Sequence, residues 1–129
     1  MTPKRIPQPQ TIRRIEKSFA WLDHRLLRDG FLKVMTPSEH SLYLFLVLAA
    51  DRDGVSFYRQ EKIADALGLD YGEFRRARRR LIERGLIAFA PYHEHTPNGY
   101  YQVLPVPTAA PDPMGGLFSG NLGVPTGLS

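Results

Sequence analysis

The stretch FRRARRRLIERGLI, residues 74–87, places five arginines in the six positions 75–80. Apolar side chains recur within it at i, i+3, i+7 and i+8, the spacing that gathers them on one face of a helix. These side chains belong to Phe74, Ala77, Leu81 and Ile82. The stretch therefore predicts an amphipathic helix whose apolar face lies against a core and whose other side carries arginines.

The residues at either end of this stretch define the bounds of the helix. Asp70 with Glu73 three positions later has the pattern of a capping box, in which each side chain accepts a hydrogen bond from the other residue's backbone N–H. Gly85 follows the last turn, where a glycine commonly ends a helix. We therefore expect a helix over residues 70–84.

Another helix is indicated by TPSE, residues 36–39, because proline suits a first turn and a carboxylate favours the positive end of a helix. It would continue through SEHSLYLFLVLAA and stop before the Asp53-Gly54 pair. Its apolar arc is wide and comprises Leu42, Phe45, Leu46 and Ala49 at helical spacing, with Leu44, Val47 and Leu48 beside them. We expect this helix at the centre of the core, with Leu46 buried together with Phe74 and Leu81.

Shorter signals complete the order of elements. Residues 55–57 are a candidate strand, and residues 59–67 are a candidate helix that Gly68 ends. Two further strands are predicted over residues 86–90 and 100–104, and the turn residues between them indicate a hairpin.

The resulting order is helix, short strand, helix, tight turn, helix and hairpin. It resembles the winged helix-turn-helix of bacterial repressors of the GntR and MarR kind. The resemblance is carried by YRQEKIADALGLDYGEFRRARRRLIERGLI, residues 58–87. It implies a mainly α fold with a small β-hairpin, and DNA binding without ligand sensing because no effector domain follows. Arg78 departs from the family pattern, which usually has a leucine there, and this implies a weaker core contact.

The arginine face admits two interpretations. A run of charge on a helix is usually a solvated face. A helix face that only needs to be soluble is most stable when positive and negative side chains alternate. Here two pairs of arginines stand four residues apart, namely Arg75 with Arg79 and Arg76 with Arg80, so each pair joins two positive charges. Each such pair costs about 0.2–0.5 kcal/mol. Since a phosphate backbone would offset this repulsion, we expect the face to contact double-stranded DNA.

The helix-turn-helix resemblance implies a role for each basic residue. The N-terminal part of the helix 70–84 would enter the major groove and present side chains to base edges, where arginine prefers guanine. Tyr71, Arg75 and Arg76 are the candidates for this role. Arg79 and Arg80 would lie along phosphates, and the preceding helix would add Arg59 and Lys62. The predicted DNA-binding residues are thus Arg59, Lys62, Tyr71, Arg75, Arg76, Arg79 and Arg80.

Composition divides the chain into three parts. Residues 1–10, with three prolines and two basic residues, are expected to be a flexible basic arm. Residues 11–104 hold nearly all the apolar side chains and are expected to form the domain. Residues 105–129 are rich in proline and glycine, which predicts a disordered tail whose removal leaves the fold stable. That tail is also a candidate docking peptide for a protein partner.

The segment before residue 36 has two competing patterns. Five side chains fit one helical face, and such a helix would either complete the core or pair with a second copy to form a homodimer. They are Ile12, Ile15, Phe19, Leu22 and Leu26. Phe19 and Trp21 alternate around Ala20, however, which suits a strand. Basic residues of this region that would lie beside DNA are Lys4, Arg5, Arg13 and Arg14.

Catalytic, metal and membrane interpretations are not favoured. Without cysteine, the chain can form neither a disulfide nor a Cys-based zinc site. His93-Glu94-His95 supplies at most half of a metal site, and with Asn98 it predicts a weak minor-groove contact at the hairpin tip. No apolar run approaches the ~18 residues that span a bilayer. We expect a cytoplasmic, nucleoid-associated protein that is not an enzyme and uses no metal or cofactor.

Three functions stay open at this point. The favoured one is a small DNA-binding protein of a bacterium or mobile element that regulates transcription by occupying an operator. The second is a replication or transposition accessory protein, because initiators also use winged helices. The third is a protein-interaction module whose arginine face meets an acidic partner.

Overall fold

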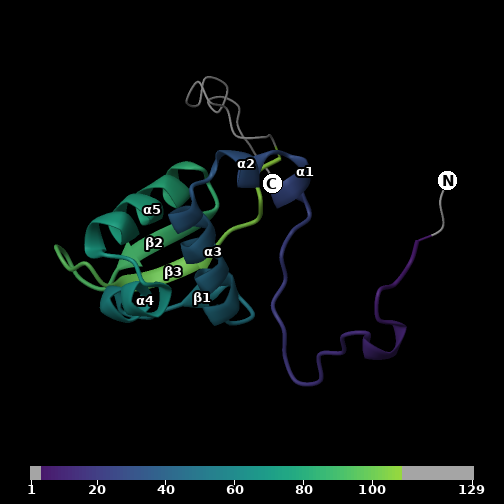
Figure 1. Ribbon diagram of the computed structural model, residues 1–129. Coiled ribbons are helices and arrows are strands. Elements are labelled where there is room, and N and C mark those ends of the chain that lie inside the picture. The colour runs from purple at the N-terminus through teal and green to yellow at the C-terminus, as the bar shows by residue number, and fades with distance from the viewer. Residues whose placement is uncertain (1–3, 109–129) are drawn as a thin grey trace.

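The computed structural model describes residues 4–108, in which helices pack on one face of a three-stranded antiparallel sheet (Figure 1). A 3-10 turn at Pro9–Thr11 and two short helices precede the main elements. In chain order the elements are α1 (Arg25–Arg28), α2 (Phe31–Val34), α3 (Pro37–Ala49), β1 (Val55–Ser56), α4 (Gln60–Leu67), α5 (Tyr71–Glu83), β2 (Ile87–Pro91) and β3 (Gly99–Val103). From α3 onward this order confirms the sequence prediction, and the hairpin strands differ from it by one residue at their ends.

The sheet has the order β1-β3-β2, so the strand of residues 55–56 pairs with the outer edge of the hairpin. Val55 lies opposite Gln102, and Phe89 lies opposite Tyr101. Tyr101 faces the helices and is 1% exposed, whereas Tyr100 faces away and is half exposed. The alternation along β3 therefore covers one sheet face with helices and leaves the other open.

Helix α3 is central, as predicted. Its N-cap Thr36 accepts a hydrogen bond from the backbone N–H of Glu39 at 3.2 Å. Leu42 and Leu46 have no exposed surface, but Leu44 and Leu48 are 48% and 66% exposed. The wide apolar arc of α3 is thus only partly buried, and an apolar strip of this helix faces solvent.

The bounds of α5 confirm the predicted capping box and the glycine stop. Asp70 accepts from the backbone N–H of Glu73, and the Glu73 side chain accepts from that of Asp70. The inward residues Phe74, Ala77 and Leu81 are buried in the same cluster as Leu46, which confirms that predicted contact. The predicted inward position of Ile82 is wrong, because this side chain is 41% exposed.

The N-terminal segment contradicts both predicted patterns. Residues 12–22 form neither a helix nor a strand, and the first buried residue of the described chain is Leu26 in α1. In Figure 1 this segment runs away from the packed helices. A helix with a single apolar face depends on a surface that covers this face. Within residues 4–108 no surface covers the apolar side chains of this segment, and its periodic pattern does not produce a helix.

At the other end, packing continues past the expected boundary at residue 104. The backbone N–H of Leu104 donates to the carbonyl of Leu86, and Val106 is buried. The expectation for the tail otherwise falls on residues 109–129, which lie outside the described residues. In the described part of the chain, no helix is both long and apolar enough to cross a membrane.

Candidate nucleic-acid interface

Helices α4 and α5 are joined by a tight turn whose geometry is set by Gly68. This residue has a φ of +69°, a left-handed conformation that glycine adopts without the steric cost of a side chain. Its backbone N–H donates to Asp65, and that of Leu69 donates to Ala64, so the last carbonyls of α4 are satisfied. The capping box of α5 begins at Asp70, directly after Leu69. This local sequence therefore ends one helix and starts the next within three residues.

Arg84, the last arginine of the stretch 74–87, is mostly buried and is paired within the domain. Its Nε donates to Glu39 Oε1 at 2.8 Å, and its Nη2 donates to the carbonyl oxygen of Val34 at 3.0 Å. Glu39 is 1% exposed and needs a cationic partner, because an unpaired buried carboxylate is costly. Arg84 thus ties the C-terminal end of α5 to α3 and to α2.

Arg78 is also engaged within the fold. It donates to the carbonyl oxygen of Pro97 and to the Tyr101 hydroxyl, each at 3.2 Å. Its guanidinium lies 4.6 Å from the ring centre of Phe89 and 5.2 Å from that of Phe74, within the range of cation–π attraction. Burial raises the pKa of Tyr101, and the Arg78 hydrogen bond opposes this effect. The position where we expected a weaker core contact therefore links α5 to the hairpin.

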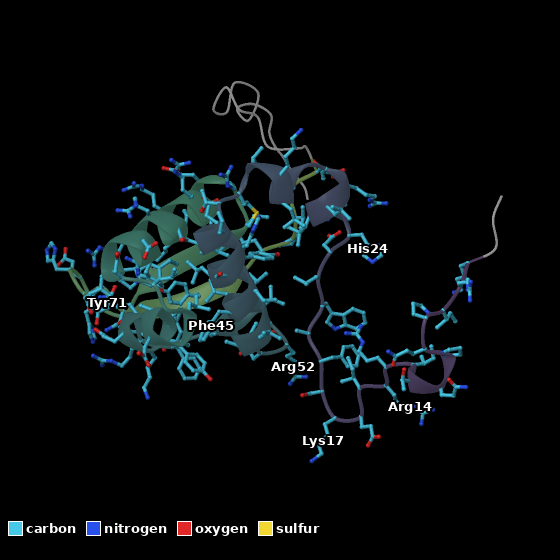
Figure 2. The ribbon with its side chains drawn as sticks, viewed as in Figure 1. Arg14, Lys17, His24, Phe45, Arg52 and Tyr71 are labelled. Atoms are coloured by element: carbon cyan, nitrogen blue, oxygen red, sulfur yellow. The ribbon has the colours of Figure 1, made fainter. Side chains whose placement is uncertain are left out.

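The other four arginines are exposed on α5 and form no ion pair with a described residue. They are Arg75, Arg76, Arg79 and Arg80. Tyr71, at the N-terminal end of the same helix, is 46% exposed and is labelled in Figure 2. The structure therefore brings five of the predicted site residues together on the solvent side of one helix.

The two predicted site residues of α4 are exposed as well. The side chain of Arg59 is 67% exposed and lies 3.3 Å from a carboxylate oxygen of Glu61, while Lys62 faces solvent without an ion pair among the described residues. One backbone donor at the N-terminus of α4 is already occupied. The backbone N–H of Gln60 donates to Asn98 Oδ1 at 2.8 Å, so this donor cannot also bind an external anion.

The loop between β2 and β3, residues 92–98, is anchored at both ends. Tyr92 Oη donates to the carbonyl oxygen of Phe57, and the Tyr92 N–H donates to that of Asn98. His93, Glu94 and His95 are exposed, but Asn98 is buried, which corrects its predicted place at the tip. Within the described residues no three His, Cys, Asp or Glu side chains are arranged to hold a metal ion.

Sequence reasoning missed the anchoring role of Asn98, although a signal for it was available. Arg59 precedes α4, and arginine is not one of the side chains that cap a helix start. A missing local cap indicates that the first backbone donors bind a partner elsewhere in the chain. The remote Asn98 meets this need from 38 positions away.

The chain matches no protein-family model, and no curated protein or solved structure is significantly similar to it.

Proposed function

We propose that the domain is a winged helix-turn-helix and that it binds double-stranded DNA with α5 in the major groove. The element order supports this proposal, since the tight turn at Gly68 joins two helices and a hairpin follows the second one. In this proposal the loop 92–98 is the wing. Its contacts with Gln60 and Arg78 hold it beside both helices of the motif.

The observation that carries the proposal is the division of the arginines on α5. Arg78 and Arg84 have partners inside the domain, whereas the other four have none among the described residues. Like charges four residues apart repel, and cations near a helix N-terminus are disfavoured by the helix dipole. These four arginines have no partner in the described domain and repel one another. Binding to an external polyanion such as DNA would offset this repulsion and would explain their presence on α5.

The dimensions of α5 fit the proposed groove. Its 13 residues make a rod about 20 Å long, and with side chains a helix is about 10–12 Å wide, close to the width of the major groove. Tyr71, Arg75 and Arg76 in its N-terminal half would contact base edges. Arg79 and Arg80 would contact phosphates, as would Arg59 and Lys62 on α4.

The biological role that we propose is transcriptional regulation by occupation of an operator in a bacterium or mobile element. Regulation of this kind places the protein with the nucleoid in the cytoplasm.

Titration of a labelled duplex at several salt concentrations tests the proposal. With four phosphate contacts, a log–log plot of affinity against salt falls with a slope of roughly −3.6 per protomer. The double variant Arg79→Ala/Arg80→Ala flattens this slope by about two units and weakens binding to all sequences alike. By contrast, Arg75→Ala or Arg76→Ala relaxes preference at one base position by about 1–3 kcal/mol.

The matched control is Arg28→Ala/Lys33→Ala, which removes the same charge from α1 and α2. Both residues are exposed and lie outside the helix-turn-helix. This variant should keep the slope of the unaltered chain. Absence of duplex binding at low salt, or equal loss in the two double variants, would refute a DNA interface on α5.

A further inference from the structure

A groove of about 460 Å³ lies between α1, α2 and the outer side of α3. In Figure 1, α1 and α2 lie at the end of the domain opposite to the loop between β2 and β3. The surface of the groove is mostly apolar, and its walls consist of Leu22, Leu26, Leu27, Leu32, Met35 and Leu44. Two of these side chains, Leu26 and Met35, belong to the buried core, so the packing of the domain fixes the floor of the groove.

The groove belongs to the folded domain, since only one of its lining residues comes from the segment 12–22. The start of α1 is held by Asp23, whose carboxylate accepts from the backbone N–H of Arg25 at 2.8 Å. Across the groove, His40 Nε2 of α3 lies at hydrogen-bond distance, 2.9 Å, from the carbonyl oxygen of Leu32 in α2. These contacts keep the three helices in place around the space.

One polar group in the groove has no partner in the described chain. Tyr43 of α3 lines the groove and is 6% exposed, and its hydroxyl forms no hydrogen bond with a described residue. Burial raises the pKa of Tyr43, and the negative charge of Asp23 adds to this effect, so the phenol keeps its proton. Polar groups that are buried nearly always have a hydrogen-bond partner. The Tyr43 hydroxyl is therefore available as a donor to a molecule in the groove.

The charges beside the groove balance one another. Asp23 forms an ion pair with Arg25 at 2.8 Å, and Arg28, which also lines the groove, is followed directly by Asp29. A ligand that carried a charge into this apolar space would lose its hydration without gaining an unpaired partner of opposite sign. The surroundings therefore favour an uncharged ligand over an anion or a cation.

We infer that the groove binds a small, uncharged, mainly apolar molecule with one hydroxyl or carbonyl oxygen, which accepts a hydrogen bond from the Tyr43 hydroxyl. Its volume lies in the range of sites for single small molecules, about 300–1,000 Å³, and such sites combine apolar walls with few polar groups.

The size of the groove also argues against a peptide helix as its occupant. One helical turn, about 10 Å wide and 5.4 Å long, fills roughly 400 Å³. The groove thus has room for about one turn, whereas a helix that docks in a groove uses anchors over at least two turns, at i, i+3, i+4 and i+7.

Titration of the full chain with octanol, octanoate and octylamine tests the inference. The three probes share one apolar chain and differ in their charge at neutral pH. By isothermal titration calorimetry we expect octanol to bind saturably and about tenfold more tightly than either charged probe. At about ten times its Kd, octanol should raise the Tm by roughly 5–10 °C.

Substitutions in the walls locate the binding site. Leu44→Asp on α3 or Leu27→Asp on α1 should weaken octanol binding more than about tenfold, because the ligand would desolvate the new carboxylate. Both side chains are exposed, so the Tm without ligand should stay close to that of the unaltered chain. Leu48→Asp is the matched control, because Leu48 lies one turn after Leu44 on α3, is 66% exposed and does not line this groove.

Tyr43→Phe tests the polar contact, because it removes only the hydroxyl oxygen. It should weaken octanol binding about threefold to tenfold. The Tm without ligand should not fall, since this hydroxyl forms no hydrogen bond with a described residue. Rescue of the affinity by a probe without an oxygen is not expected.

Four results would overturn the inference. They are the absence of saturable binding by any probe, a charged probe that binds as tightly as octanol, equal losses in Leu44→Asp and Leu48→Asp, and an unchanged octanol affinity in Tyr43→Phe. None of them bears on DNA binding by α5, which is measured without these probes.

Discussion

Arg78 illustrates how one side chain can serve both the core and the hairpin. Its stem lies on the flank of α5 that packs inward, and its guanidinium contacts two aromatic rings and the carbonyl of Pro97. A leucine there would fill apolar space but would offer no donor to the loop. We interpret the arginine as the residue that fixes the loop relative to α5.

This interpretation predicts that Arg78→Ala lowers the free energy of unfolding by about 2 kcal/mol, from a lost cation–π contact and lost hydrogen bonds. Urea denaturation measures the change. Arg79→Ala is the matched control, because Arg79 is the next residue along the helix and its side chain is exposed. Loss of this arginine relieves like-charge repulsion, so the free energy of unfolding should stay equal or rise slightly. Equal stability of the two variants would contradict a structural role for Arg78.

At the scale of elements, the two faces of α5 differ at adjacent positions. Leu81 has no exposed surface and contacts the central core, whereas Ile82 is 41% exposed. Leu81→Ala should therefore cost about 2–5 kcal/mol, and Ile82→Ala about 1 kcal/mol or less. Thermal or chemical unfolding of both variants checks the face assignment. Similar costs at the two positions would mean that α5 is rotated relative to the core.

The elements that were predicted correctly have local sequence signals that mark where they start and end. Asp70 and Glu73 fix the start of α5, and Gly68 and Gly85 supply left-handed residues at helix ends. Such signals act between near neighbours, so they do not depend on the rest of the fold. The exposure of the candidate site was predictable for the same reason, since charged residues opposite an apolar face are expected in solvent.

The failures share the opposite cause, because they depend on contacts between distant residues. Helical spacing in residues 12–22 was genuine, but a helix there needed a covering surface that the described chain does not provide. The roles of Arg78 and Arg84 depend on Pro97 and Glu39, which lie 19 and 45 positions away. Helical spacing places both arginines beside the apolar face, since Arg78 lies four residues after Phe74 and Arg84 lies three after Leu81, but it does not reveal the partners that they bind.

At the scale of the molecule, the C-terminal limit of the packed chain can be measured. A chain ending at residue 104 loses Val106, which is 4% exposed, whereas one ending at residue 108 keeps it. Burial of a valine side chain stabilises by about 1.5–3 kcal/mol, so the shorter chain should be less stable by this amount. The denaturant midpoints of the two chains measure this difference in stability. Identical midpoints would restore the boundary at residue 104.

The two anchors of the hairpin loop also have a consequence for engineering. Tyr92 and Asn98 clamp the ends of the loop, and the exposed residues 93–95 between them make no long-range side-chain hydrogen bond in the described chain. Exposed loop tips tolerate inserted sequence when their flanking backbone is held in place. A short foreign peptide, such as an epitope or a fluorophore acceptor tag, can therefore be inserted after Glu94, where the anchored ends of the loop hold it in place on the domain.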